Sequence, residues 1–104
     1  MPRFKNLPPA AYVVENGQFP EGPFRADTPP AVRAAAAFAR RLIWFMGGAQ
    51  ESQRKFAAKA GVSQAVISRI ANGQNLPDLA TIANLEEALV EDLWMPVRDR
   101  FKIQ

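Results

Sequence analysis

The chain contains no cysteine and no histidine among its 104 residues. Without cysteine there is no disulfide framework, no thiolate zinc site and no cysteine nucleophile. Without histidine the chain also lacks the commonest metal ligand and the usual general base at neutral pH. The acidic pairs Glu86-Glu87 and Glu91-Asp92 are typical of solvated helix and turn acids rather than of a catalytic pocket. We therefore expect no enzyme, no metal site and no cofactor.

A long apolar run is also missing. The longest near-continuous one, Leu42 to Ala49, is too short to span a bilayer. The N-terminus is rich in proline and lacks the apolar segment of a cleavable signal peptide. With 48% apolar residues, the chain can still bury the modest core of one domain. These features predict a soluble, cytoplasmic protein with no membrane partner.

Basic residues are absent from one long stretch of the chain. Residues 70–97 hold five acidic side chains and no basic one, whereas residues 1–69 hold ten basic and four acidic side chains. Residues 98–104 add three basic side chains and one acidic side chain. Such a separation indicates one face meant for a polyanion and another turned away from it, or else chance clustering on ordinary solvated faces.

Residues 1–30 hold seven of the nine prolines and predict an extended arm rather than a helix. Two short apolar segments in this arm flank Asn16-Gly17, a dipeptide that favours tight hairpin turns. A two-stranded hairpin alone is only marginally stable, so it would need to pack on helices. We thus expect an arm, residues 1–30, followed by a helical domain, residues 31–104.

A first helix is expected over residues 31–46, with Thr28 as its cap and Gly47-Gly48 after its end. Its apolar residues recur at helical spacing and form a wider stripe than one small bundle needs. The simplest explanation is that an aromatic residue of the arm covers Phe38 and Phe45, and the alternative is a dimer contact. The residues of the stripe are Val32, Ala36, Phe38, Ala39, Leu42, Ile43, Phe45 and Met46, and the arm offers Tyr12, Phe19 and Phe24.

Two short helices are expected next, over residues 53–60 and 63–73, separated by Gly61-Val62-Ser63. Ser52 is the expected cap of the first and Ser63 that of the second. Gly61 suits the positive φ with which many helices end. The inward-facing residues are Phe56, Ala57, Ala60, Ile67, Ile70 and Ala71.

A further helix is expected over residues 78–90, and residues 91–95 should return Leu93 and Trp94 to the core. Pro96 breaks this turn, and residues 97–104 are expected to add one more helical turn. The predicted fold class is all-α, a compact bundle of four to five helices with a proline-rich N-terminal arm. Trp44 is expected in the core or at an interface. The buried positions expected in helix 78–90 are Leu79, Ile82, Ala83, Leu85 and Leu89.

The outer side of helix 63–73 differs from its apolar side. It carries hydrogen-bonding groups and one small residue, and a short helix with such a strip suits the major groove of DNA. Glutamine and arginine can each make two hydrogen bonds to a base edge there. The residues of this strip are Gln64, Ala65, Ser68, Arg69 and Asn72.

The stretch from Gln53 to Leu89 resembles the phage-repressor-like helix-turn-helix family, the Cro/Xre type. The spacing of Gln53, Ala57, Gly61-Val62 and Ile67-Ser68 carries the resemblance. It implies a cytoplasmic DNA-binding protein of bacterial or phage origin that places residues 63–73 in the major groove. Further matching residues are Ser52, Ser63-Gln64, Arg69-Ile70, Asn72-Gly73, Pro77-Asp78-Leu79, Leu85 and Leu89.

The resemblance also implies individual roles. Arg69 is the strongest candidate for a bidentate contact to guanine, and Ala65 is suited only to a thymine methyl group. Gln53 would hold a phosphate near a helix N-terminus. The residues expected at base edges are Gln64, Ala65, Ser68 and Arg69, and those expected at phosphates are Gln53, Arg54, Lys55, Ser63, Asn72 and Asn75.

Lys55 stands where the family often has a glutamate, which removes one capping interaction. The segment after Pro96 is too short for the full fifth helix with which some members dimerise, so a homodimer remains only an option. The predicted function is a sequence-specific regulator of transcription that binds double-stranded DNA, in particular a repressor. The alternative is a protein-interaction module, such as an antitoxin or an RNA-polymerase-binding regulator, whose N-terminal arm binds the partner.

Overall fold

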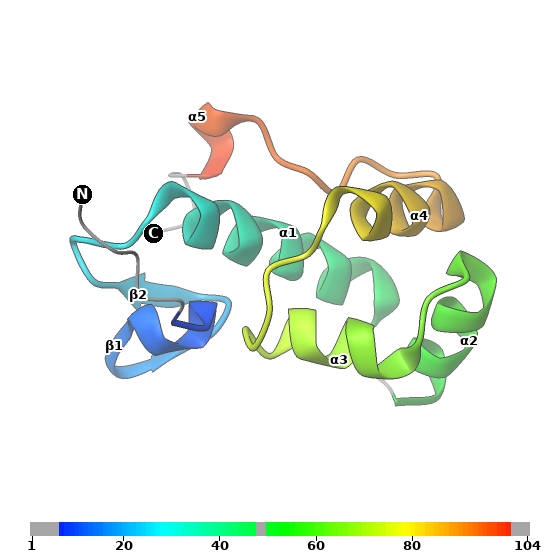
Figure 1. The fold of residues 1–104 in the computed structure, drawn as a ribbon, viewed down its shortest axis with the longest axis horizontal. Helices are drawn as coiled ribbons and strands as arrows, with labels where there is room; N and C mark the ends of the chain where they lie inside the picture. The colour runs from blue at the N-terminus through cyan, green and yellow to red at the C-terminus, as the bar shows by residue number, and fades with distance from the viewer. Residues whose placement is uncertain (1–6, 48–49, 101–104) are drawn as a thin grey trace.

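The structure is a computed structural model that describes residues 7–47 and 50–100 of the chain. Within these ranges it is mostly helical, with one small two-stranded antiparallel sheet (Figure 1). The expected all-α class is therefore only approximately right, because the arm forms two strands and a 3-10 helix. The elements are η1 (Pro9–Tyr12), β1 (Val13–Gln18), β2 (Gly22–Phe24), α1 (Pro30–Met46), α2 (Gln50–Ala60), α3 (Gln64–Ala71), α4 (Leu79–Leu89) and α5 (Val97–Arg100).

Helix α1 runs through the middle of the molecule, with the sheet and α3 on one side and α4 and α5 on the other (Figure 1). Every residue from 34 to 39 is buried, and Phe38 and Leu42 are fully enclosed. All of that stretch except Phe38 is alanine. Alanine favours a helix, and its small side chain lets neighbouring elements approach closely. The alanine run therefore allows α1 to be covered on several sides at once.

The main core lies between α1 and the helices α2, α3 and α4. The predicted apolar sides of α1, α2 and α3 all contribute to it. Enclosing one such large side chain stabilises the fold by about 1.5–3 kcal/mol. The core residues are Phe38, Leu42, Met46, Phe56, Ala57, Ile67, Ile70, Ile82, Leu85, Ala88 and Leu93.

The expected cap of α1 is wrong. The cap position is Pro29, and no side chain caps the helix there. Thr28 is buried, and its hydroxyl donates a 2.6 Å hydrogen bond to the carbonyl oxygen of Arg25. Pro30 occupies the first turn, where its missing N–H costs no helical hydrogen bond.

The expected cap of α2 is also wrong, because α2 begins at Gln50 and Ser52 lies inside it.

At the C-terminal end of α1 the prediction is confirmed. Gly47 has a φ of 80° and its N–H donates to the carbonyl oxygen of Ile43, which closes the helix. Gly48, expected beside it, lies outside the described residues.

The predicted hairpin exists, but its turn was placed wrongly. Asn16 and Gly17 lie inside β1, and the chain reverses at residues 19–21. The paired positions are Val13 with Phe24 and Gln18 with Gly22, so β1 has more residues between them than β2. Asn16 takes a φ of 70° in this irregular stretch. The left-handed tendency of asparagine is therefore used in a bulge and not in the hairpin turn.

The arm packs on the helices but does not cover Phe38 and Phe45 as expected. Phe38 instead contacts the ring of Trp94 at a centroid distance of 6.4 Å. The guanidinium of Arg41 lies 5.3 Å from the centre of the Phe45 ring. Trp44, expected in the core or at an interface, is 80% exposed.

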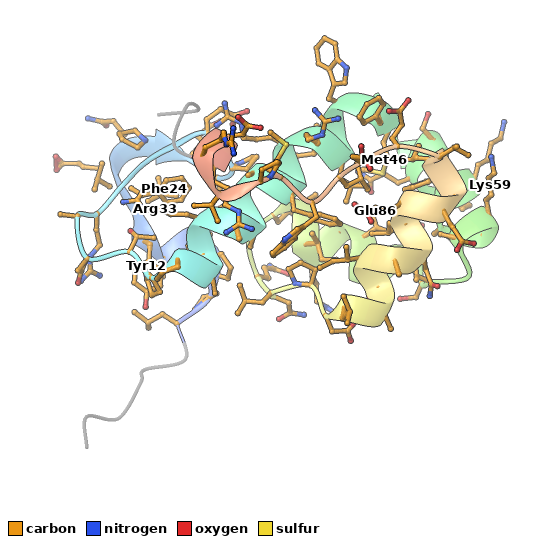
Figure 2. All side chains as sticks on the ribbon, turned by 90° about the horizontal axis from the view of Figure 1, so that it is seen from above. Tyr12, Phe24, Arg33, Met46, Lys59 and Glu86 are labelled. Atoms are coloured by element: carbon orange, nitrogen blue, oxygen red, sulfur yellow. The ribbon has the colours of Figure 1, made fainter. Side chains whose placement is uncertain are left out.

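The arm covers the N-terminal half of α1. Tyr12 is buried, and the Arg25 guanidinium lies 5.4 Å from the centre of its ring. Phe24 lines the same hollow as Arg33, Ala36 and other residues of α1, and Figure 2 shows Phe24 and Arg33 next to each other. The proline-rich segment is thus part of the folded unit over its described residues.

Helix α4 is rotated relative to the prediction. Ile82 and Leu85 are buried as expected and Leu89 is half-buried, but Leu79 is 80% exposed and Ala83 also faces solvent. The extra buried position is Ala88. The core thus lies on the side between Ile82 and Ala88, because α4 packs against α2 there.

Glu86 holds the segment that returns from α4 to the core. Its Oε2 atom accepts hydrogen bonds of 2.9 Å from the backbone N–H groups of Leu93 and Trp94. The expectation that Glu86 is a merely solvated acid is therefore wrong. Leu93 is fully buried, and the predicted last helical turn forms as α5; residues 101–104 lie outside the described part.

Replacing Glu86 with alanine should lower the free energy of unfolding by about 1–3 kcal/mol, because two backbone donors lose a charged acceptor. Urea denaturation of the two proteins measures the difference. Glu87→Ala is the matched control, since Glu87 is exposed and makes no such contact to residues 93 and 94. Equal losses in both variants would contradict the structural role of Glu86.

Asp78 caps α4 and should make stability depend on pH. Its carboxylate accepts from the Thr81 N–H at 2.8 Å, and this bond lowers the pKa of Asp78 below its ordinary value of 3.8. The stabilisation is present above the ordinary value and is lost as the pH falls through the lowered pKa. Wild type should therefore lose stability relative to Asp78→Asn, which keeps a capping oxygen but does not titrate, when unfolding is followed from pH 5 down to about pH 2. If the difference in the free energy of unfolding between the two proteins does not change with pH, the titration of the Asp78 cap does not control stability.

Candidate functional site

The connection between α2 and α3 is built as the sequence predicts. Gly61 has a φ of +73°, and nothing lies within 4 Å of the position that a Cβ would take. The positive φ alone therefore favours glycine there. The N–H of Val62 donates to the carbonyl oxygen of Ala57 at 3.1 Å, and Ser63 Oγ accepts from the Val66 N–H at 3.1 Å. These bonds end α2 and begin α3 within a few residues, which fixes the angle between the two helices.

Helix α2 is held to the core by one side. Phe56 and Ala57 are buried, and the small side chain of Ala57 permits a close crossing of the helices. The opposite side faces solvent with Arg54 and Lys55, while Gln53 is half-buried. Lys59 is exposed as well and extends away from the molecule in Figure 2. An outward-facing side of α2 is therefore basic.

Helix α3 has an apolar and a polar face, as expected from its sequence. Ile67 is fully buried and Ile70 is 2% exposed. On the other face Ala65 and Arg69 are exposed, and Gln64 and Ser68 are half-buried. The four residues predicted to contact base edges thus belong to one solvent-accessible strip of one helix.

The remaining predicted residues border this strip. Ser63 stands at the N-terminus of α3, and Asn72 and Asn75 follow its C-terminus, all three exposed. The Asn72 side-chain amide donates to Ser68 Oγ at 3.4 Å. Gln53, Arg54 and Lys55 lie on α2, so the predicted residues belong to α2, the turn, α3 and the four residues after it, whose exposed sides are called the α2–α3 surface. The arrangement offers amide, hydroxyl and guanidinium donors and several positive charges.

Most acidic residues of the C-terminal half gather at the end of α4 and just after it. Glu86, Glu87, Glu91 and Asp92 line a shallow hollow with Ala83 and Val90 at the C-terminal end of α4. The charge separation seen in the sequence is thus carried by different elements, with exposed positive groups on α2 and α3 and four of the five acidic side chains of residues 70–97 at the end of α4 and just after it.

One connection to this surface was not expected. The arm meets the end of α3 at Gly73, through the ring of Phe19 and the backbone N–H of Ala10. The sequence signals only that glycine suits a helix end, and no spacing rule links residue 19 to residue 73. The contact is visible only once the arm is folded onto the helices.

Two other kinds of site are not found in the described residues. No group of three or more histidine, cysteine, aspartate or glutamate side chains is placed to hold a metal ion. No helix in the ranges 7–47 and 50–100 is long and apolar enough to cross a membrane.

A family model described as helix-turn-helix matches residues 52–89. The match begins inside α2 and ends at the last residue of α4, so it contains the whole of α3 and both turns that flank it. No match was found among curated proteins, and none among solved structures. The matched model is of the Cro/C1 type, which agrees with the residues that resemble the Cro/Xre family. Residues 52–89 are therefore similar to helix-turn-helix domains of the Cro/C1 type.

Proposed function

We propose that this protein is a sequence-specific regulator of transcription that inserts α3 into the major groove of double-stranded DNA, and that it acts as a repressor. The family match supports a DNA-binding helix-turn-helix regulator. The observation that carries the proposal is the division of α3 into an enclosed apolar face and an accessible polar face. A helix that shows solvent donors and acceptors along one side can place them at base edges.

In this proposal Arg69 makes the main contact to a base edge. It is exposed in the last turn of α3, where its guanidinium is free to extend from the helix. A bidentate pair with guanine O6 and N7 discriminates against other bases by about 1–3 kcal/mol. Ala65 would contact a thymine methyl group, and Gln64 and Ser68 would bond to neighbouring bases.

The border residues would hold the DNA backbone. Arg54 and Lys55 on α2 supply charge, and the other donors supply hydrogen bonds that fix register without reading sequence. Positive groups that neutralise phosphates make affinity fall as salt rises. The hydrogen-bonding residues in this group are Gln53, Ser63, Asn72 and Asn75.

A partner-binding arm was the alternative function. It rested on Tyr12, Phe19 and Phe24 being available to another protein. Tyr12 is buried, while Phe19 and Phe24 are half-buried and contact each other with ring centroids 6.3 Å apart. These rings serve the fold of the chain itself, so the described part of the arm, from residue 7 onward, does not favour the alternative. Removing residues 1–25 would expose α1 and cannot serve as a clean test of it.

Arg69→Ala should abolish selective binding. Fluorescence anisotropy compares a labelled pool of fragments from the gene's own promoter region with a scrambled pool, at low and moderate salt. We expect at least about tenfold weaker binding to the promoter pool, because the bidentate contact to guanine is lost. Arg98→Ala is the matched control, since Arg98 is an exposed arginine of α5, on the other side of α1 from α3 (Figure 1). Weak binding that is equal for both pools and unchanged by Arg69→Ala would overturn the proposal.

Arg54→Ala should weaken binding to all DNA by a similar factor. In this proposal its exposed guanidinium neutralises one phosphate, so the slope of log affinity against log salt concentration should become shallower by about 1. Anisotropy titrations at several salt concentrations measure that slope for wild type, Arg54→Ala and Arg98→Ala. A slope that Arg54→Ala leaves unchanged would remove Arg54 from the phosphate contacts.

A further inference from the structure

The N-terminal arm contacts the chain at Gly73, two residues after the end of α3. The N–H of Ala10, in η1, donates a 2.8 Å hydrogen bond to the Gly73 carbonyl oxygen. Gly73 is buried although Asn72 and Gln74 on either side of it are exposed. The arm therefore covers the point at which the chain leaves α3.

Phe19 packs directly on the backbone of Gly73. A Cβ atom built on Gly73 would lie 2.7 Å from Cγ of the Phe19 ring and 2.9 Å from its Cδ2. Gly73 also has a φ of +73°, a conformation that other residues rarely adopt. Glycine is thus required twice at this position, once by the backbone angle and once by the ring that rests on it.

The Phe19 ring is itself fixed from the side of α1. It contacts Phe24 edge to face, with an angle of 82° between the ring planes. Phe24 in turn lines a hollow with Ala36 and Ala37 of α1. Phe19 therefore lies between Gly73 and Phe24, and Phe24 borders a hollow that residues of α1 also line.

The end of α3 that lies next to the arm is also the end that carries Arg69. The Gln74 N–H donates to the carbonyl oxygen of Arg69 at 2.8 Å, and the Gly73 N–H donates to that of Ile70 at 3.2 Å. A helix as short as α3 has little stability of its own and depends on what packs against it. These two bonds tie Gly73 and Gln74 to the last turn of α3.

We propose that the arm positions α3 for DNA binding. Phe19 is the positioning residue, and it acts through Gly73 on Arg69 and Asn72. This inference rests on the proposed DNA-binding function. Loosening the contact would allow the last turn of α3 to shift. Discrimination between DNA sequences then falls, because bidentate base contacts tolerate little displacement. The contacts that α2 makes to the DNA phosphates persist.

A double-mutant cycle between Phe19 and Gly73 tests the proposal. The full-length chain, Phe19→Ala, Gly73→Ala and the double variant are compared by anisotropy on the promoter and scrambled pools. Because an added Cβ collides with the Phe19 ring only when that ring is present, Gly73→Ala should weaken promoter binding by roughly three- to tenfold more in wild type than in Phe19→Ala. Phe19→Ala alone should lower the ratio of promoter to scrambled affinity. Glu86→Ala, which destabilises the fold away from α3, should leave that ratio unchanged.

Amide hydrogen exchange gives a reading that does not depend on DNA. In Phe19→Ala the amides of residues 72–74 should exchange faster than in wild type, while those of α4 should not. Phe19→Leu takes the place of Phe19→Ala if circular dichroism shows that the latter does not fold. Equal effects of Gly73→Ala in both backgrounds, or unchanged protection of residues 72–74, would overturn the proposal. If wild type binds no DNA selectively, the proposed function fails, and exchange alone decides whether the arm holds α3.

Discussion

The burial of α1 on several sides is the constraint on which the rest of the structure depends. Its alanine run lets the arm, α3, α4 and α5 all approach one helix. Two large residues, Phe38 and Leu42, fill the space that the alanines leave. Because α3 contacts this helix directly, the orientation of α3 relative to the rest of the molecule is set by contacts with α1 as well as by the short turn from α2.

Helices α2 and α3 combine buried apolar residues with exposed polar and basic side chains. The buried residues Ile67 and Ile70 anchor α3, while Arg69, Asn72 and Asn75 are exposed to solvent. Positive charge on α2 and the acidic end of α4 lie on different elements. This division suits a protein that meets a polyanion with one face and keeps its negative charges away from it.

Much of the helical part could be predicted from the sequence, because local rules control it. Gly61, Val62 and Ser63 form a turn by backbone angle and capping, and the apolar spacing of α3 defines its buried face. The wrong predictions concern residues whose surroundings depend on distant parts of the chain. Leu79 fits the helical stripe of α4 but is 80% exposed, since α4 turns Ala88 to the core instead. Asn16 fits a hairpin turn but lies in a bulge, and Glu86 fits a solvated acid but binds two backbone N–H groups.

The sequence by itself determined the helix-turn-helix, the two faces of α3 and the separation of charge, because each depends on residue types at short, regular spacing. Only the tertiary structure decided the place of the arm. The packing of Phe19 on Gly73 joins residues far apart in the chain and depends on shape, namely the absence of a side chain at one position and a flat ring at the other. No periodic pattern encodes such a contact, since its free energy comes from the fit of two surfaces that exist only after folding.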